Sequence, residues 1–347
     1  MRSEGSPRAT LARVAQRAGV SVMTASYTYN RPDRVSPTTR ERVLAAAAEL
    51  GYAGPDPRAR SLRRGSTLTL GVVLGERLGY AFEDPGAVSF LAGVADVCAD
   101  QGYGMTILPL TGDDDDVPRV TEAAVDGFIV WTTSDDDPVL AAVLATRRPA
   151  VIHGGPSQEG LRLVSIDNRA AARAIGALAF TGARRPAVLS LPLGRDRFSG
   201  IRRGGEVTDV RFPVTRDRLA GYREAATAVG SDWDDVPVAV CGRNDVQEAE
   251  RWATRLLASA DRPDAIAAMS DQLAVGVARA ARTARCRIPD ELAVTGWDDV
   301  PAAAELGLTT VAQSLHEQGL ACARAALGEE PGDFAAAWSV VRRTSTR

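Results

Sequence analysis

Lysine is absent from this sequence of 347 residues, so all 41 basic side chains are arginine. An arginine at any single position is therefore a weak indication of a bidentate contact, and the distribution of charge along the chain is more informative. Cysteine is scarce as well, and the four cysteines form no CxxC pair: Cys98, Cys241, Cys286 and Cys322. This spacing argues against a zinc site and is typical of a protein in a reducing compartment.

Signatures of cofactors, membranes and catalysis are also missing. No Gly-x-Gly-x-x-Gly follows a strand and no GxxxxGK precedes Ser or Thr, which excludes the usual dinucleotide and P-loop sites. Residues 1–10 are polar, and no apolar run approaches the roughly 18 residues that span a bilayer. We therefore expect a cytoplasmic protein with no membrane partner. No pair of nucleophile and base supports an enzyme, and the run Asp113–Asp116 is interpreted as a solvated loop. We expect no cofactor, catalytic residue or metal site.

Positive charge is concentrated near the N-terminus, although the whole chain has a net charge of −3. Residues 1–66 contain 12 arginines and five acidic residues, a net charge of +7, and the rest of the chain carries −10. A basic segment in an otherwise acidic protein is typical of a nucleic-acid-binding module.

Short helices are predicted within this basic segment. Leu11, Val14 and Ala18 lie at helical spacing. Gly19 then provides a turn, and Ser21 is a suitable N-cap for a second helix. Two short helices around a glycine-containing turn are the helix-turn-helix signature, so this segment is predicted to be a DNA-binding head.

The second helix is expected to present an apolar face to a major groove. Val22, Met23 and Tyr27 would lie on this outward face. Thr24 and Ser26 would offer their hydroxyl groups to phosphates.

A third helix is predicted from about Pro37 to Leu50, with Ser36 as its N-cap. Tyr29 is interpreted as part of the core that the three helices share, rather than as a base-stacking residue. The apolar face of the third helix is expected to comprise Val43, Leu44, Ala47 and Leu50.

A proline-bounded basic segment follows. Pro55 and Pro57 precede the run Arg58–Arg64, which is long enough for two helical turns. A helix this short is marginal in water, so one interpretation is a mobile basic linker. The alternative is that two copies pair on DNA and insert Leu62 between minor-groove bases while the arginines bind phosphate.

The following 280 or so residues are enough for two α/β lobes. Apolar runs bounded by turns alternate with helical stretches, which is the pattern of parallel sheets covered by helices. Such sheets bind ligands at the carboxyl ends of their strands. The segment from Gly194 to Pro213 is interpreted as a flexible insertion beside the cleft. The predicted strands are Leu68–Leu74, Met105–Leu110, Gly127–Trp131, Ala150–His153, Leu163–Ile166, Ala187–Leu191, Val236–Cys241, Ala265–Met269 and Leu292–Thr295.

Seven sequence blocks distributed along the chain carry a family resemblance: TLARVAQRAGVS, VSPTTRERVLAAAAELGY, ARSLRRGSTLTLGVV, RLAGY, SDQLAVG, VTGWDD and LTTVAQ. On these blocks the chain resembles the lac-repressor-like (LacI/GalR) transcription regulators. The resemblance implies an α/β protein with a three-helix head, a hinge, and a two-lobed, doubly wound core similar to type I periplasmic binding proteins. The implied boundaries are 1–52 for the head, 53–66 for the hinge and 67–347 for the core, with lobes at 67–166 plus 298–325 and at 167–297 plus 326–347.

The resemblance also implies which residues contact DNA. Val22 and Met23 would read bases, and Tyr27 stands where many members have an arginine. This departure predicts contacts with thymine methyl groups and a contact from the tyrosine hydroxyl in place of an arginine–guanine pair. The expected DNA-contacting residues are Thr10, Leu11, Ser21, Val22, Met23, Thr24, Ser26, Tyr27, Asn30, Arg34, Ser36, Thr39, Arg40, Arg58, Ala59 and Leu62.

Residues at the predicted strand ends suit a polyhydroxylated effector, because carboxylates, an amide and an arginine beside aromatic rings donate and accept in pairs. Asp271 is equally well interpreted as a helix N-cap, and the Tyr80–Asp84 segment could equally contact a second subunit. Family members often carry an aspartate after the strand that ends here in His153, Gly154 and Gly155, so a ligand contact made there is absent or replaced. The expected effector-binding residues are Tyr80, Phe82, Asp84, Trp131, Arg218, Asp271, Trp297, Asp298 and Gln313.

These features predict a transcriptional regulator, specifically a repressor, that binds a near-palindromic operator in double-stranded DNA as a homodimer. A small molecule, expected to be a carbohydrate, would control it from the cleft between the lobes. The chain ends soon after the strand-like WSVVRR with no leucine-heptad tail, which favours a dimer over a tetramer. The alternative is a two-lobe sugar receptor without a DNA role, which would need an export signal and no basic head.

Overall fold

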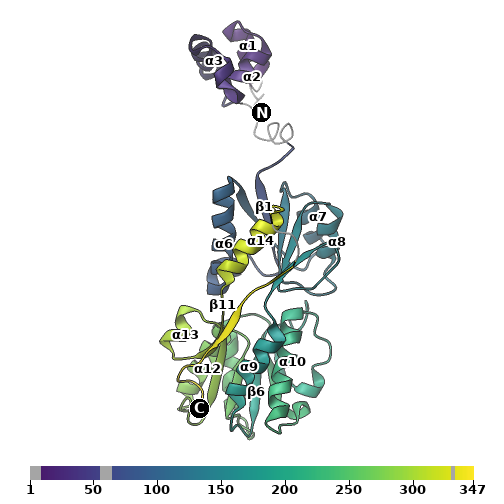
Figure 1. Ribbon diagram of the computed structural model, residues 1–347, viewed down its shortest axis with the longest axis vertical. Coiled ribbons are helices and arrows are strands. Elements are labelled where there is room, and N and C mark those ends of the chain that lie inside the picture. Colours follow the sequence, from purple (N-terminus) through teal and green to yellow (C-terminus); the bar gives the residue numbers. More distant parts are fainter. Residues whose placement is uncertain (1–8, 55–64, 330–332) are drawn as a thin grey trace, which may run out of the picture. The chain divides into compact units, whose positions relative to one another are not determined.

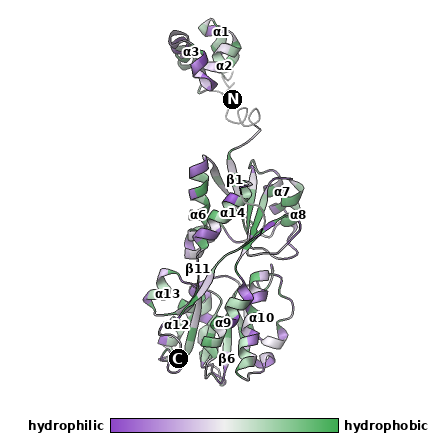
Figure 2. Cartoon of the chain, viewed as in Figure 1, coloured by the Kyte–Doolittle hydropathy of each residue, from purple (hydrophilic) through white to green (hydrophobic). Residues whose placement is uncertain are grey.

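The computed structural model describes residues 9–54, 65–329 and 333–347, and it divides into two compact units, 1–67 and 68–347. Figure 1 shows the elements of each unit, and Figure 2 shows that the strands are largely apolar while the helices contain both polar and apolar residues. The hinge residues that we expected to contact DNA, Arg58, Ala59 and Leu62, lie outside the described residues. Within the described ranges, no helix is both long and apolar enough to cross a lipid bilayer.

The described part of the first unit, residues 9–54 and 65–67, contains three α-helices, each begun by a hydroxyl side chain. The oxygens of Thr10, Ser21 and Ser36 accept hydrogen bonds from backbone N–H groups three residues further on. The first helix ends at Gly19, whose φ of 63° lies in the left-handed region that glycine tolerates. The elements are α1 (Leu11–Ala18), α2 (Val22–Asn30), the 3₁₀ turn η1 (Pro32–Arg34) and α3 (Pro37–Glu49).

Small apolar side chains form the core of this unit. Val14, Ala25 and Val43 from the three helices are completely buried. Tyr29 packs against them, and its ring lies 6.0 Å from the ring of Tyr52 in an edge-to-face arrangement. The core assignment of Tyr29 is therefore confirmed. The prediction for Leu44 is wrong, because its side chain is 42% exposed on the outer side of α3.

The second unit begins with a lobe built on a parallel six-stranded sheet (Figure 1). Two helices, α6 (Pro85–Gln101) and α14 (Leu315–Ala326), pack together on one face, and α7 (Asp116–Thr121) and α8 (Pro138–Ala145) cover the other. A short helix, α5 (Tyr80–Glu83), precedes α6. In spatial order the strands are β12 (Phe334–Ala335), β5 (Arg162–Ser165), β4 (Ala150–His153), β3 (Gly127–Trp131), β1 (Thr69–Leu74) and β2 (Gly104–Pro109).

The two helices of the first face approach closely because glycines lie at their contact. A Cβ atom on Gly93 of α6 would lie 2.1 Å from the carbonyl oxygen of His316 in α14. A Cβ on Gly319 would similarly lie 2.2 Å from the carbonyl oxygen of Phe90. Backbone contact of this kind leaves no room for side chains and holds α14 against the first lobe.

The second lobe contains a seven-stranded mixed sheet. Helices α9 (Asn168–Phe180) and α10 (Pro213–Ala228) form one packed pair, and α11 (Val246–Leu257) and α12 (Asp271–Thr283) form another. Right-handed crossovers place the two pairs on opposite faces of the sheet. In spatial order the strands are β13 (Trp338–Val341), β11 (Thr309–Gln313), β10 (Ala293–Asp298), β9 (Ala265–Ala268), β6 (Pro186–Ser190), β8 (Pro237–Val240) and β7 (Gly200–Arg203). The remaining elements are the 3₁₀ turns η2 (Gly204–Glu206) and η3 (Trp233–Asp235) and helix α13 (Pro301–Glu305).

The sheets correct two details of the predicted lobes. Residues 298–325 were expected in the first lobe, but β11 pairs with β10 and β13 in the second. Residues 326–347 were expected in the second lobe, but β12 pairs with β5 in the first. The physical reason is that the chain crosses between the lobes again after β11 and after β12. Strand β12 (Phe334–Ala335) is too short to carry a periodic signal in the sequence.

The segment from Gly194 to Pro213 is also more regular than predicted. Its residues Gly200–Arg203 form β7, which pairs antiparallel with β8 at the edge of the second sheet. The interpretation of the whole segment as a flexible insertion is therefore wrong. The glycines and arginines around β7 concealed the strand, because only Ile201 among its four residues is a typical strand former.

Candidate functional sites

The outward face of α2 carries large exposed apolar side chains. Val22 is 51% and Met23 is 64% exposed, whereas Ala25 and Thr28 on the opposite face are buried. Tyr27 is half-buried beside them. A helix face of this kind can make apolar contacts with a partner, and the major groove offers thymine methyl groups to such a face.

The hydroxyl groups that we expected near phosphates are hydrogen-bonded locally. Ser21 Oγ accepts from the backbone N–H of Thr24 at 3.0 Å and lies 2.8 Å from Thr24 Oγ1. Asn30 Nδ2 donates to Ser26 Oγ at 3.2 Å. A hydroxyl group has one donor and two acceptor positions, so each retains capacity for a further bond.

The other described residues that we expected to contact DNA lie mainly at helix caps or on the exposed surface. Thr10 and Ser36 cap α1 and α3, and Thr39 Oγ1 accepts from Ser36 Oγ at 2.9 Å. The arginines of this set, Arg34 and Arg40, are exposed. Leu11 differs from these, because its side chain packs against the core of the head. A DNA contact from Leu11 would therefore come from its backbone.

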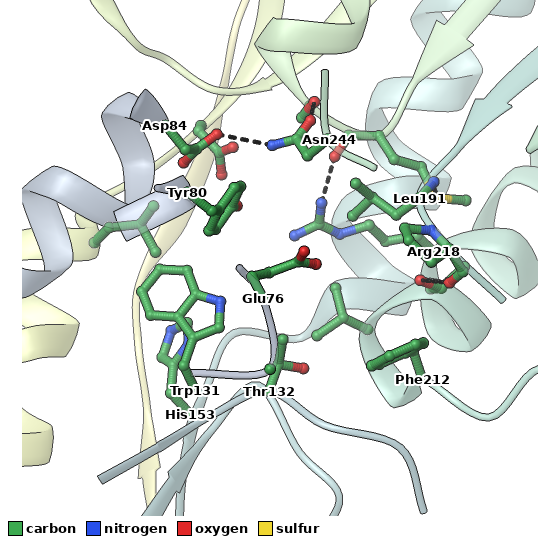
Figure 3. Close-up of a pocket in the computed structure, with 18 of the residues that line it drawn as sticks. Glu76, Tyr80, Asp84, Trp131, Thr132, His153, Leu191, Phe212, Arg218 and Asn244 are labelled. Carbon is green, nitrogen blue, oxygen red and sulfur yellow. Dashed lines mark hydrogen bonds between the residues drawn. The ribbon is translucent and has the colours of Figure 1, made fainter. Parts of the chain in front are cut away.

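In the second unit, residues at the carboxyl ends of strands from both sheets line a common cavity of about 120 Å³ (Figure 3). The first lobe contributes Glu76 after β1, Trp131 at the end of β3 and His153 at the end of β4. The second lobe contributes Asp298 at the end of β10 and Gln313 at the end of β11. The cavity therefore lies where parallel α/β sheets bind ligands.

The structure brings six of the nine expected effector-binding residues to this cavity. They are Tyr80, Asp84, Trp131, Arg218, Asp298 and Gln313. The other three, Phe82, Asp271 and Trp297, do not line it.

Each of the three exceptions has a physical reason. Phe82 is 68% exposed at the surface of α5. Trp297 is completely buried behind the guanidinium of Arg218, whose Cζ lies 3.8 Å from the indole centroid. The positions of Phe82 and Trp297 follow from helix and strand geometry, in which successive side chains point in different directions.

Asp271 is a buried structural residue. Its two carboxylate oxygens accept from Thr310 Oγ1 at 2.8 Å and from the backbone N–H of Val300 at 2.9 Å. The N-cap of α12 is Ser270, whose Oγ accepts from the backbone N–H of Leu273 at 3.1 Å. The alternative interpretation of Asp271 as the N-cap is therefore wrong as well. Burial raises the pKa of Asp271 to about 6.

Arg218 is the buried cation of the cavity. Its Nε donates to Asn168 Oδ1 at 2.9 Å, and its Nη1 donates to the carbonyl oxygen of Met269 at 2.5 Å. Together with the stacking on Trp297, these bonds hold the guanidinium plane in one orientation. Burial lowers the pKa of Arg218, and the carboxylate of Asp298 opposes that effect.

The carboxyl group of Asp298 interacts electrostatically with this arginine. The backbone φ of Asp298 is 105°, which is unusual for a residue with a side chain, and its Oδ1 accepts from Gln313 Nε2 at 2.7 Å. Burial raises the pKa of Asp298 to about 8, while Arg218 lowers it. A carboxyl group and a guanidinium held on one wall can bind neighbouring hydroxyl groups of a ligand.

Several polar contacts cross from one lobe to the other at the rim of the cavity. Asn244 Nδ2 donates to Asp84 Oδ2 at 2.9 Å (Figure 3). Arg197 of the second lobe donates from Nη1 to Glu76 Oε1 and from Nη2 to the carbonyl oxygen of Gly75, each at 2.5 Å. An ion pair between Arg216 and Asp135 bridges the lobes further out. In this arrangement the lobes are closed around the cavity.

Besides His153, the sequence analysis missed six polar residues of the cavity wall: Glu76, Thr132, Arg197, Thr215, Asn244 and Ser270. Glu76 and Ser270 each follow a predicted strand, so the strand-end rule alone could have found them. Asn244 comes a few residues after β8 and could have been found in the same way. Arg197 could not, because it lies in the segment that was interpreted as a flexible insertion.

His153 lines the cavity and is 8% exposed. Its Nε2 lies 2.9 Å from Gln318 Oε1. Burial lowers the pKa of His153 to about 4, and Arg218 contributes to the same effect. The imidazole is therefore neutral at physiological pH. Among the described residues, no group of three His, Cys, Asp or Glu side chains could hold a metal ion.

Comparison with known proteins identifies the family of this chain. Residues 10–54 match the model for bacterial regulatory proteins of the lacI family, and residues 175–345 match a periplasmic binding protein-like domain. An HTH-type transcriptional regulator of Mycobacterium tuberculosis is 40% identical over 316 residues, which cover 89% of this chain and 88% of the relative. The chain belongs to the LacI family of transcriptional regulators. This family consists of DNA-binding regulators rather than enzymes.

Solved structures of LacI-family regulators share the fold over almost the whole chain. A LacI-family regulator from Corynebacterium glutamicum is 31% identical with a TM-score of 0.74, and covers 99% of this chain and 100% of that one. A complex of the regulator CelR with cellobiose is 28% identical with a TM-score of 0.68, and covers 97% of this chain and 100% of that one.

Replacing Asp298 with asparagine is expected to stabilise the core at alkaline pH. The folded-state pKa of about 8 lies above the ordinary value of 3.8, so the fold favours the protonated carboxyl group. Its contribution to stability is present below about pH 4 and is lost as the pH rises through 8. We expect Asp298→Asn to gain on the order of 1–2 kcal/mol over the parent above pH 8, and little below pH 4.

Thermal unfolding of both proteins across this pH range would measure the effect. Asp299→Asn is the matched control, because Asp299 also has a positive φ but forms an ion pair with Arg343 at 2.7 Å. It should show no alkaline gain. An Asp298→Asn variant whose stability relative to the parent did not change with pH would contradict the buried-carboxyl explanation.

Proposed function

We propose that this LacI-family regulator is a repressor that binds a near-palindromic operator in double-stranded DNA as a homodimer. A small-molecule effector in the cavity between the lobes would control that binding. The observation that carries the proposal is the presence in one chain of a basic head with an exposed apolar recognition face and a closed two-lobe cavity with a buried arginine. A sugar receptor without a DNA role would have no use for the head.

A face of the first lobe supports the homodimer. Leu78, Phe82 and Val88, which lie at or near α5 and the start of α6, are 47%, 68% and 45% exposed. Large apolar side chains gathered on one short segment are typical of a protein interface. We propose that two copies pair through this face, and that their heads then meet two half-sites related by the same twofold axis.

The charges of the cavity favour an uncharged effector. Glu76 is paired with Arg197, and Arg218 is bonded to two oxygens and lies near Asp298. The cavity wall contains two arginines and three carboxyl groups, those of Glu76, Asp84 and Asp298, so a phosphate or carboxylate on the ligand would gain little. Hydroxyl groups could bond to Asp298, Asn244 and Arg218 while Trp131 covers an apolar ring face. We propose that the effector is a neutral carbohydrate.

The recognition face is tested by selecting half-sites from random DNA with the full chain and measuring affinities by fluorescence anisotropy. We expect Met23→Ala and Tyr27→Ala to lose about 1–3 kcal/mol at the selected base pairs. Affinity of the parent should fall steeply as salt is raised, because arginines displace counterions from phosphates. Leu44→Ala is the matched control, since Leu44 is exposed on α3 and should leave affinity unchanged.

Sedimentation of the same samples is expected to show a dimer, free and on a two-half-site duplex. Selected half-sites that bind Met23→Ala and Tyr27→Ala as tightly as the parent would contradict the base-reading role. Undetectable or salt-independent DNA binding would contradict the regulator itself, and a monomer on DNA would contradict the pairing face.

The effector is tested by thermal-shift screening of neutral sugars and their phosphates, because a ligand of the folded core raises its melting temperature. We expect a neutral sugar to stabilise the parent and its phosphate ester to have no effect. Arg218→Lys should abolish the stabilisation, since an ammonium cannot reproduce the stacked, forked contacts of Arg218. Arg223→Lys, an exposed position on the same helix, should retain it. Stabilisation by the phosphate alone would contradict the neutral class of ligand.

A further inference from the structure

A second pocket adjoins the effector cavity at the strand-end edge of the first sheet. Its volume of about 100 Å³ is similar to that of the cavity. Its first-lobe wall follows the ends of β1, β2 and β3, at Gly75, Thr111 and Thr133, whereas the first-lobe wall of the cavity follows β1, β3 and β4. Strands β1 and β3 are neighbours, with β2 and β4 on either side of them. The second pocket therefore continues the cavity along the edge where parallel sheets bind ligands.

One side chain separates the second pocket from the cavity. The two have three lining residues in common: Gly75, Arg197 and Phe212. Arg197 Nη2 donates to the carbonyl oxygen of Gly75 at 2.5 Å, and Arg197 Cζ lies 5.4 Å from the centroid of the Phe212 ring. The guanidinium of Arg197 therefore lies between the backbone of the first lobe and an aromatic ring of the second, and it forms the partition between the two spaces.

The fold holds the backbone of Arg197 in place. The loop that carries it is closed at its base, because the backbone N–H of Arg211 donates to the carbonyl oxygen of Leu193 at 2.7 Å. The φ of Arg197 is 51°, in the left-handed region that residues with a side chain rarely adopt. Gly242 packs against it, since a Cβ atom there would lie 2.7 Å from the carbonyl oxygen of Arg197. Backbone strain of this kind persists only where the surrounding structure fixes it.

The second pocket suits a neutral polar group. Its two buried carboxylates already have partners, because Asp116 is paired with Arg119 and Asp137 accepts from Thr133 Oγ1 at 2.5 Å. They do not require a cation, and carboxylate oxygens can accept further hydrogen bonds from hydroxyl groups. Phe212 provides an apolar ring face in the same pocket. These are the groups that bind a sugar ring.

We propose that Arg197 determines the length of the effector by excluding a neutral saccharide that carries a second sugar ring. This inference rests on the proposed function of the cavity as an effector site. The exclusion is steric, because a second ring could enter only if the guanidinium left its acceptors, Glu76 and the carbonyl oxygen of Gly75. A side chain too short to reach Gly75 joins the two spaces, and the joined site binds a disaccharide with one ring in each.

Calorimetric titration of the full chain with neutral aldohexoses, aldopentoses and their disaccharides of every available linkage tests this role. The parent should bind a monosaccharide more tightly than its disaccharides. We expect Arg197→Ala to shift the ratio of the two affinities by about tenfold or more towards a disaccharide. The ratio within one protein is the informative quantity, since both ligands require the same closure of the lobes. Arg197→Ser is equally short and serves as a second joined-site variant.

Arg197→Met is the matched control for the cross-lobe contacts. Its long side chain still fills the space beside Phe212, but it cannot bond to Glu76 or to Gly75, so it loses the same contacts as Arg197→Ala. We expect it to retain the parent's preference for the monosaccharide. An equal gain in Arg197→Met and Arg197→Ala would assign the effect to weaker contact between the lobes and overturn the proposal. A parent that binds both lengths equally well would also overturn it.

The position of the second ring is tested with a thiol introduced by Thr111→Cys. Thr111 is an exposed residue of the second pocket, and the four native cysteines are buried. In the Arg197→Ala background, a bound disaccharide should protect this thiol from a maleimide, and a bound monosaccharide should not. Binding of the disaccharide without protection would place the second ring elsewhere and overturn the proposal.

Failure of this inference differs from failure of the proposed function. If neutral monosaccharides bind but the ratio of affinities is the same in the parent and Arg197→Ala, the inference fails and the effector site stands. If no neutral saccharide of either length binds to the parent or to any variant, both fail.

Discussion

The arrangement of the two lobes in the second unit depends on polar contacts that are made between the lobes rather than within them. At the rim of the cavity, Arg197 reaches from the second lobe to Glu76 and to the carbonyl oxygen of Gly75. Inside the cavity, the bond between Gln318 and Gln313 joins the lobes through buried amides. Each lobe is stabilised independently by its own apolar core. The cross-lobe contacts therefore determine the relation between two rigid bodies, and a polar ligand bound among them acts directly on that relation.

This arrangement explains how a small ligand could control a DNA-binding head. Strand β1 follows the head in the chain and ends directly before Gly75 and Glu76, which contact Arg197. A change in lobe closure at one end of β1 thus acts on the strand to which the head is joined. The energies are suitable for regulation, because a few hydrogen bonds are worth a few kcal/mol and allosteric coupling typically requires about 1–3 kcal/mol. In the proposed effector site, Arg218 would provide affinity without contributing to the contact between the lobes, because it is bonded to Asn168 and Met269 of the second lobe.

Much of this architecture could be predicted from the sequence, and the failures have definite causes. Apolar runs such as Gly127–Trp131 are buried on both sides, so they are visible without an alignment. The caps Ser21 and Ser36 act locally and were equally visible. Asp271 and Trp297 were assigned to the cavity because they adjoin strand ends, yet the direction of a side chain depends on register and on neighbours distant in sequence. Contacts such as Arg197 with Glu76 join residues more than a hundred positions apart, and periodicity contains no information about them.

The most direct test of the account is the distance between the lobes in solution, measured by pulsed electron resonance between spin labels at Asp100→Cys on α6 and Arg282→Cys on α12. Both positions are exposed and the four native cysteines are buried, so labelling is selective. The account predicts one short, narrow distance in the otherwise unaltered chain and a broader, longer distribution in Arg197→Ala. Arg195→Ala, an exposed neighbour in the same segment, should match the unaltered chain. A distribution that Arg197→Ala leaves unchanged would contradict the claim that these cross-lobe contacts hold the lobes closed.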